Sequence, residues 1–400
     1  MESLDEQCPY VPLHRPHGFE PPPELHRLAR RHPVTRVRVP TGQEAWLVSG
    51  HVEVRAVLTD RRFQAPGAFT QAADYGIPVA FQRPGSPLAV DGREHSRLRN
   101  VLKAAFSSRK VTAMRPRIKA ISEDLLDDMA HQKPPVDLHQ YFSSPLPVTV
   151  VCEMLDVPVK DRSELIRLAD SANVNSLGDQ DAASRAWDNF CRFLLELVER
   201  RKREPSDDLI SQIAAHHAAD GFPAAETATL IATMIVAGHQ TTAVQIEWGV
   251  LGLLQHPAQH DHLLAAPQLL PQAVEEIVRS FPIGALMAVP RFTTEDVVIA
   301  GTRIKARSLV LASVQEAGFD SSLFDEPQNF DIGRRNNPHL AFGYGPHYCT
   351  GAALARLEIE IALGTLFQRF PSLHIAVPLD DLQVNHANIA GGLVGLPVAW

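Results

Sequence analysis

The longest helical pattern in the sequence runs from Pro223 to Gln255 and sets the scale of the fold. Its 33 residues would span roughly 50 Å at 1.5 Å per residue, and His256 followed by Pro257 ends it. A helix of this length usually crosses a whole domain. At its centre, Gly238 is a poor helix former, but it leaves space beside the backbone for another group.

A second segment, Phe342 to Gly351, places one cysteine in a glycine-punctuated loop that opens onto an apolar helical pattern. A thiolate is a strong ligand for haem iron, and Cys349 is well placed to act as one. Gly343 and Gly345 allow a tight loop, and the positive end of the following helix lowers the pKa of a thiol. The alternative is a buried, inert cysteine in a glycine-rich turn.

Other residues of this loop suit a flat, anionic cofactor. Phe342 can pack over the sulfur and exclude water, and His347 can reach an anionic group at the cofactor edge. Gly351 lets the start of the helix lie flat against a planar ligand. Backbone N–H donors around a thiolate also tune the potential of a bound iron.

Composition places the chain among compact globular proteins. Its 400 residues are 45% hydrophobic and 21% charged, which is enough for one large domain or two ordinary ones. Four widely spaced cysteines indicate neither a disulfide framework nor a zinc site. The first 19 residues lack a signal-peptide core, and no run of about 18 apolar residues occurs. We therefore expect a cytoplasmic protein that neither is secreted nor spans a membrane.

Charge argues against one class of partner and suggests another. A net charge of −8 makes nucleic acid an unlikely general partner. Between Arg93 and Lys119, however, nine residues are basic and only Glu94 is acidic. This stretch is either an ordinary solvated helix face or, beside a haem, a docking surface for an acidic electron carrier such as a ferredoxin.

The loop from Phe342 to Gly351 resembles the F-G-x-G-x-H-x-C-x-G signature of the cytochrome P450 superfamily, and Leu354-Ala355-Arg356 follows it as in that family. The resemblance implies a mainly α fold with small β-sheets, a triangular prism. In it, haem b (iron protoporphyrin IX) lies between a long central helix and the Cys349 loop. It also implies a single domain over residues 1–400, β-rich at about 30–90 and 283–312.

Further landmarks of the family occur along the chain. The segment from His95 to Arg99 matches an H-x-x-x-R element whose two basic side chains contact the haem propionates, and Arg291 matches a third propionate-binding position. Glu276 and Arg279 match the E-x-x-R pair, which the family buries to tie its helix to the meander before the haem loop. The meander match covers residues 324–334.

The centre of the long helix matches the oxygen-activating element A-G-x-(D/E)-T-(T/S) with one departure. Ala237, Gly238 and Thr241 match, and the resemblance implies that the Thr241 hydroxyl steers protons to bound oxygen. The alternative for Thr241 is a hydrogen bond to its own helix backbone. Gln240 replaces the acid, and because an amide cannot carry the proton, the alternatives are delivery through waters, Thr242 or another route, or slower delivery. A second departure is Ala317-Gly318-Phe319-Asp320, where bacterial members commonly read A-N-R-D.

The candidate substrate pocket follows from the family pattern alone. The stretch from Ala65 to Val90 reads as a long loop, and in the family this region covers the substrate. The apolar stretches 283–289 and 388–394 are also expected at the pocket. The pocket residues proposed on this basis are Phe69, Tyr75, Phe81, Ile283, Leu286, Met287, Leu393 and Val394.

The function implied by this resemblance is monooxygenation of an apolar natural-product scaffold by O2. Electrons would come from a ferredoxin and its NAD(P)H-dependent reductase, since no glycine-rich dinucleotide fingerprint follows a strand in this chain. One alternative is oxidative C–C or C–N coupling of aromatic natural products, for example cyclic dipeptides. A remote alternative is a haem-thiolate sensor without turnover.

Overall fold

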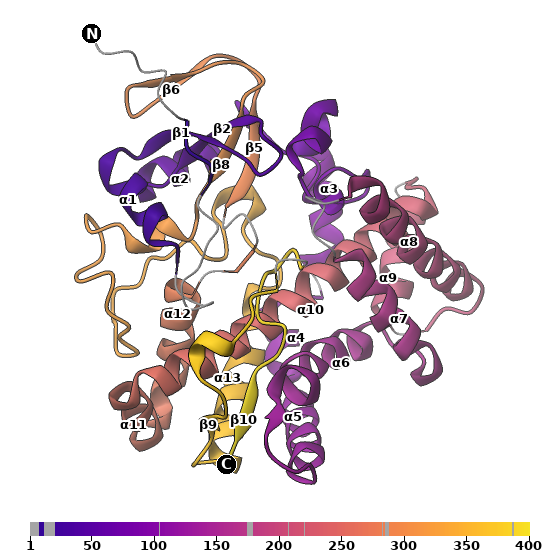
Figure 1. Ribbon diagram of the computed structural model, residues 1–400. Coiled ribbons are helices and arrows are strands. Elements are labelled where there is room, and N and C mark those ends of the chain that lie inside the picture. The colour runs from indigo at the N-terminus through magenta and orange to yellow at the C-terminus, as the bar shows by residue number, and fades with distance from the viewer. Residues whose placement is uncertain are drawn as a thin grey trace.

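The computed structural model describes residues 8–11, 21–103, 105–173, 179–206, 208–219, 221–281, 283–284, 288–385 and 388–400. The fold is mainly helical, with small β-sheets at its edges (Figure 1), as predicted. The principal helices are α1 (Pro23–Arg31), α2 (His51–Thr59), α3 (Gly92–Lys103), α4 (Ser108–Ala113), α5 (Arg115–Ala130), α6 (Pro145–Met154), α7 (Val159–Ala172), α8 (Gln180–Arg203), α9 (Leu209–Ala219), α10 (Ala224–Gln255), α11 (Pro257–Ala265), α12 (Leu270–Ser280) and α13 (Ala352–Arg369). That one domain covers residues 1–400 stays a prediction.

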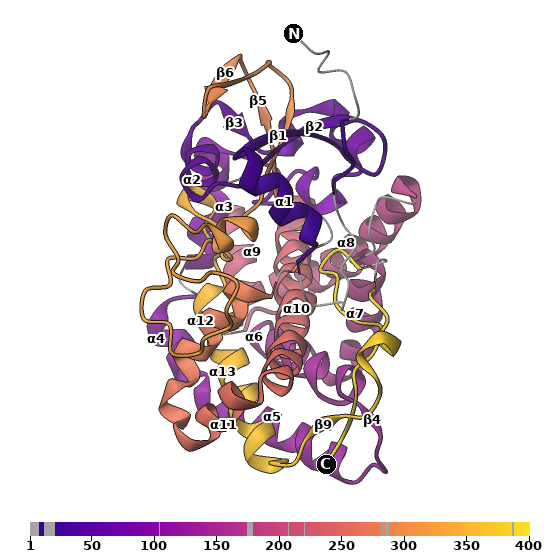
Figure 2. The same ribbon diagram turned by 60° about the vertical axis from the view of Figure 1, so that its left-hand side comes forward.

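The largest sheet has five strands in the order β1-β2-β8-β5-β3, and only β2 and β8 pair in parallel. Strands β1 and β2 pair in antiparallel and lie within the stretch of about 30–90 that was expected to be β-rich. The strands among the described residues are β1 (Val34–Arg38), β2 (Glu44–Val48), β3 (Phe63–Gln64), β4 (Val136–Asp137), β5 (Val289–Thr293), β6 (Val297–Ile299), β7 (Thr302–Ile304), β8 (Leu309–Ala312), β9 (His374–Ile375) and β10 (Pro397–Ala399). Because β5 and β8 form the sheet interior, a segment near residue 290 lies beside the N-terminal strands (Figure 2).

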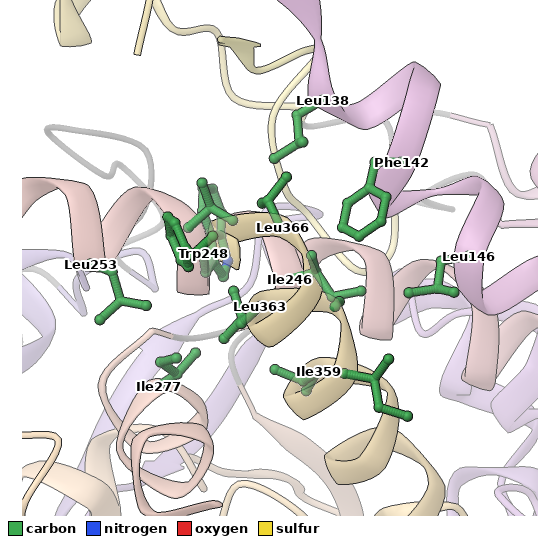
Figure 3. Packing of buried hydrophobic residues seen from close by; sticks show 14 of the residues in the cluster. Leu138, Phe142, Leu146, Ile246, Trp248, Leu253, Ile277, Ile359, Leu363 and Leu366 are labelled. Carbon is green, nitrogen blue, oxygen red and sulfur yellow. The ribbon is translucent and has the colours of Figure 1, made fainter. Parts of the chain in front are cut away.

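Helix α10 is confirmed as the long central helix, with 32 residues. Most of its side chains are buried, because α6, α8, α12 and α13 all pack against it. Trp248 lies in the main apolar cluster with Ile277 of α12 and Leu363 of α13 (Figure 3). A Cβ atom at Gly249 would lie 3.2 Å from both Ile277 and Leu363, so a small residue lets these helices approach closely. This packing fixes the direction of α13, which begins beside Cys349.

Three short 3-10 helices occur in the stretch predicted as a loop, at Pro66–Ala68, Thr70–Tyr75 and Val79–Phe81. The loop prediction is right about the absence of long helices or strands, but it missed these local turns, since single turns leave no periodic pattern in a sequence. No helix among the described residues is long and apolar enough to cross a membrane.

Candidate functional site

The loop that carries Cys349 is held in shape by two glycines. Gly343 and Gly345 have φ of 75° and 71°, a left-handed backbone that other residues adopt only at a cost. A Cβ atom at Gly345 would lie 2.9 Å from Thr59 in α2, so the loop also rests directly on the N-terminal part of the chain. The Cys349 amide donates to the Phe342 carbonyl at 2.8 Å and closes the loop.

The thiol of Cys349 is accessible, yet burial raises its pKa because the surrounding protein disfavours the thiolate. These two findings agree if the sulfur faces a space inside the molecule rather than the outer surface. Three groups act against the effect of burial on this pKa: the Gly351 amide, which donates to the sulfur, and the guanidiniums of Arg99 and Arg356. The loop therefore supplies the donor and charges that a metal-bound thiolate needs.

A cluster that the sequence analysis missed fixes this loop between α12 and α13. Glu275 on α12 accepts two hydrogen bonds from Arg356 on α13, at 2.5 and 2.9 Å, and one from His339 at 3.0 Å. Because the Ala341 amide donates to His339 Nδ1 at 3.2 Å, the imidazole proton lies on Nε2 and points at Glu275. Burial alone would raise the pKa of Glu275, but these hydrogen bonds outweigh it and lower the pKa to about 2.

Four basic side chains converge beside the loop with one carboxylate among them. Arg291 on β5 is buried, and its one described hydrogen bond goes to the neighbouring Pro290 carbonyl, at 2.9 Å. The rings of His95 and His347 lie 4.0 Å apart. His347 bonds Asp91 at 2.7 Å. The fourth member is Arg99, which donates to the Tyr348 carbonyl at 2.5 Å.

The charges of this cluster remain incompletely balanced. Burial, followed by the positive charges of His347 and Arg99, lowers the pKa of His95 to about 3. Burial likewise lowers the pKa of Arg291, and the negative charge of Asp91 acts against this shift. A buried guanidinium without a bonded carboxylate is costly unless an anion arrives. The cluster thus has the chemistry of a site for an anionic ligand such as a carboxylate pair.

One face of α10 is open in the part predicted to activate oxygen. Ala237 is exposed and Gly238 and Thr241 are partly exposed, whereas the residues around them in the helix are buried. Thr241 Oγ1 donates to the Ala237 carbonyl at 2.6 Å, which is the alternative considered from the sequence. A Cβ atom at Gly238 would meet only Val151 of α6, at 3.7 Å. The missing side chain of Gly238 therefore faces α6, and the accessible face is formed by Ala237 and Thr241.

The predicted pair of Glu276 and Arg279 forms a fully buried ion pair, with 2.7 and 2.8 Å between its atoms. Arg279 also donates to the Gly318 and Pro327 carbonyls, both at 2.8 Å, so α12 is tied to the meander. Its guanidinium lies 5.3 Å from the ring centre of Phe319. This cation–π contact gives a physical reason for Phe319 in the unusual Gly318-Phe319 pair. The sequence alone offered no such reason.

The predicted pocket residues are placed in two groups. Phe69 and Tyr75 contact Phe292 of β5, with ring centres 4.8 and 5.5 Å apart, and Phe81 packs against the same cluster. These three therefore border the sheet. The residues of the second group differ in burial. Leu393 is buried and Val394 is 59% exposed, while Ile283 is partly buried. Leu286 and Met287 lie outside the described residues. Contact of any of these with a substrate stays a prediction.

Together these features fit an iron porphyrin. A single accessible thiol meets the need for one axial protein ligand, and the buried basic cluster suits two carboxylates at the rim of a flat ligand. Ala237 and Thr241 leave one helix face uncovered. The sequence analysis found the thiol and the basic residues, while the Glu275 cluster comes from three distant segments and was missed.

Comparisons with known proteins agree with this assignment. The family model described as Cytochrome P450 matches residues 148–381. Cytochrome P450 BJ-1 of Bradyrhizobium diazoefficiens is 37% identical over all of this chain and all of its own length. Mycinamicin IV hydroxylase/epoxidase of Micromonospora griseorubida is 37% identical over 97% of this chain and 98% of its own.

Solved structures show the same fold. Cytochrome P450mel 107F1 with biaryl coupling reactivity superposes with a TM-score of 0.88 and 34% identity, over 98% of this chain and 99% of that chain. Haem b is the cofactor of this family, and its chemistry is oxygen activation. The chain belongs to the cytochrome P450 family of haem-thiolate monooxygenases.

Proposed function

We propose that this monooxygenase hydroxylates an apolar natural-product scaffold with electrons supplied by a ferredoxin, and that Cys349 ligates the haem iron. The observation that carries the proposal is the thiol itself. Cys349 is exposed, its sulfur receives the Gly351 N–H, and two guanidiniums lie near it. The bound haem would supply oxygen activation and electron transfer.

The basic cluster would hold the haem by its two propionates. Arg291, His95 and Arg99 offer N–H donors, and the buried Arg291 gains most from an anionic partner because no carboxylate of the described part of the chain is bonded to it. His347 already bonds Asp91 and would act through that pair. Carboxylates beside the cluster would raise the pKa of His95 from about 3, since each new negative charge favours the imidazolium.

On the other side of the site, the chain would position the substrate and a proton donor. Thr241 holds its hydroxyl against the Ala237 carbonyl at 2.6 Å, and that hydroxyl can both donate to and accept from a water or an oxygen ligand. Ala237 presents only a methyl group on the open face, which leaves room for a bulky apolar substrate. Most of the other side chains of α10 are buried, so the helix limits the access of water to the reacting centre from behind.

The reduced, carbon-monoxide-bound absorption spectrum tests the ligand assignment. We expect a Soret band at the position of thiolate-ligated haem in the native protein, and its loss in Cys349→Ala. Cys152→Ala is the matched control, because Cys152 is fully buried on α6 and burial raises its thiol pKa to about 11. A spectrum typical of histidine-ligated haem in the native protein, or an unchanged band in Cys349→Ala, would overturn the assignment.

The substrate class is proposed from the relatives and the open α10 face. Mycinamicin IV hydroxylase/epoxidase and Nocardicin C N-oxygenase, which is 37% identical over 93% of this chain, act on natural products by name. A panel of macrolides, terpenoids and aromatic peptides would be screened for the spectral change that follows displacement of water from haem iron. Binders would then be incubated with reductase, ferredoxin and NADPH. Products that gain one oxygen atom support hydroxylation, whereas no product from any binder opposes it.

The ferredoxin would dock beside the cysteine loop. Lys103, Arg109 and Lys110 are exposed cations, whereas Arg115, Arg117 and Lys119 pair with Glu360, Glu153 and Glu123. Only part of the basic stretch seen in the sequence therefore carries unbalanced charge. Phe106, which lies between Lys103 and Arg109 in the chain, is close to the cysteine loop, since its ring is 3.9 Å from the position of a Cβ atom at Gly351.

Electron transfer from an acidic ferredoxin tests this surface. Lys110→Glu should slow haem reduction severalfold at low salt and lose the difference at high salt, because charge complementarity mainly sets the encounter rate. Lys119→Glu is the control, since it changes charge equally at a residue already paired. Equal rates of haem reduction in both variants would show that the docking surface lies elsewhere.

Oxidative coupling of aromatic groups is the second candidate, supported by Gln240 in place of an acid and by the structural neighbour with biaryl coupling reactivity. Mass analysis separates the two reactions. A coupled product loses two hydrogen atoms and gains no oxygen, whereas a hydroxylated product gains one oxygen atom. A dimeric or cyclised product from an aromatic binder would therefore replace hydroxylation as the main activity.

A further inference from the structure

Gln240 is buried on α10 and lies between two polar partners from distant segments. Its Nε2 donates to Asp170 Oδ1 at 2.8 Å, and its Oε1 accepts from Asn388 Nδ2 at 3.2 Å. Asn388 in turn accepts from Asn173, just past the end of α7, at 2.9 Å. The amide orientation at position 240 is fixed by these contacts, since Asp170 can only accept when ionised.

Asp170 links this buried position with solvent. It lies in the last turn of α7, and its side chain is 48% exposed, although one carboxylate oxygen contacts the nearly inaccessible Gln240. A carboxyl group in such a place can exchange protons with bulk water at one oxygen and face the interior with the other. No other carboxylate among the described residues has a recorded contact with Gln240.

Two histidines lie around Asp170, and their pKa values are shifted in opposite directions. His239 Nδ1 lies 3.7 Å from Asp170 Oδ1, and burial lowers the pKa of this histidine to about 4, against the opposing charge of Asp170. His139 lies farther off and bonds Glu247 at 2.6 Å, which holds its pKa above the usual value despite burial. His239 is therefore neutral near pH 7, which leaves Asp170 as the acidic group nearest to position 240.

We propose that Asp170 supplies the proton-carrying carboxyl group that position 240 lacks, and that Gln240 positions it. The inference rests on the proposed function. An amide cannot release a proton at neutral pH, whereas a carboxyl group can. In each cycle the O–H bond of protonated Asp170 would break and an O–H bond would form on a water beside Thr241, which would pass one of its own protons on to the oxygen substrate. Bulk water then returns a proton to the exposed carboxylate oxygen, and no electron moves in this step.

The variant Asp170→Asn removes the titratable proton at position 170 but keeps the hydrogen bond to Gln240. The new side chain still offers an oxygen to the Gln240 amide, but it carries no titratable proton. We expect the share of NADPH electrons that reach product to fall about 10-fold or more, within the range of general acid–base effects, while hydrogen peroxide release rises. Product formed with added hydrogen peroxide in place of oxygen and electrons should stay near the native yield, because that route needs no proton delivery. Glu164→Gln, on the same helix and paired only with Arg167, is the control.

Exchanging the two groups tests the role of the carboxyl directly. In the double variant Asp170→Asn, Gln240→Glu, the hydrogen bond remains with its direction reversed and the acid moves to α10. We expect the coupling of electrons to product to recover most of the loss. The variant Asp170→Glu keeps an acid on α7 and should resemble the native protein. A structural role for the contact predicts native coupling in Asp170→Asn instead.

A second readout needs no turnover. The pKa of His239, followed by NMR of its ring protons, should fall in Asp170→Asn because a negative charge has left its side, and return toward the native value in Asp170→Glu. Native coupling in Asp170→Asn, or no recovery in the double variant, overturns the inference. Failure of the proposed function is distinct, since it appears as a missing thiolate spectrum in the native protein.

Discussion

Replacing Glu276 with glutamine removes one charge from the centre of a buried network while it keeps the shape of the side chain. The carboxylate accepts from Arg279 Nε and Nη2, from Arg334 Nε, from Asn337 Nδ2 and from the Asp331 amide, at 2.7 to 3.3 Å. Both Glu276 and Arg279 are 0% exposed, and Arg334 is 10% exposed. Two guanidiniums would therefore lose their buried counter-ion.

The expected loss can be worked from these contacts. An amide offers one acceptor oxygen instead of two, so at least two of the five N–H donors lose their partner. Each buried, unsatisfied donor costs about 1–3 kcal/mol, which sums to about 2–6 kcal/mol. Breaking a buried ion pair from one side costs about 3–5 kcal/mol. We therefore expect Glu276→Gln to lower the free energy of unfolding by about 4 kcal/mol, a large part of the usual total.

Urea unfolding of the haem-loaded protein, followed by circular dichroism and by Soret absorbance, measures this loss. The control is Glu199→Gln, an exposed i,i+3 partner of Lys202 at 2.9 Å, for which the loss should stay within about 1 kcal/mol. A loss below about 1 kcal/mol in Glu276→Gln would refute the reasoning, because it would mean that water or other side chains satisfy the network without the carboxylate.

Three further predictions concern other contacts. Because the folded-state pKa of Glu275 is depressed to about 2, its stabilisation is present above its unfolded pKa of about 4.3. It is lost as pH falls toward 2, so Glu275→Gln should flatten acid unfolding between these values. Gly345→Ala should reduce haem content and stability more than Gly301→Ala, which shares a positive φ but has open space around it; equal losses would show that backbone strain alone decides. Phe319→Leu should lower stability by about 1 kcal/mol through its lost contact with Arg279, and a native unfolding midpoint would show that this contact contributes nothing.

The parts of the site that sequence predicted are those with a local pattern. Cys349 and the glycines around it lie within ten residues, and the pair of Glu276 and Arg279 follows helix spacing. The long helix was equally readable, since its 32 residues keep one pattern. In each case the chemistry depends on neighbours along the chain, which a single sequence displays.

The contacts that sequence could not predict join distant segments. Glu275 meets Arg356 across 81 residues, and Gln240 meets Asp170 across 70. Nothing in the spacing of such residues indicates that they touch, because the helix packing decides it. One signal was available, since two adjacent carboxylates on the predicted helix at Glu275 and Glu276 each needed a positive partner. The residue that a Cβ atom at Gly238 would meet, Val151 of α6, was likewise not predictable from the sequence, because helix packing decides it.

The two carboxylates of α12 have a mechanical consequence. Neighbouring residues on a helix point about 100° apart, and here one holds the cysteine loop through Arg356 and His339 while the next holds the meander through Arg279 and Arg334. Rotating α12 about its axis to improve one set of bonds would break the other. The helix is thus fixed by two separate sets of bonds, and a one-residue insertion within it would misalign the cysteine loop and the meander at once.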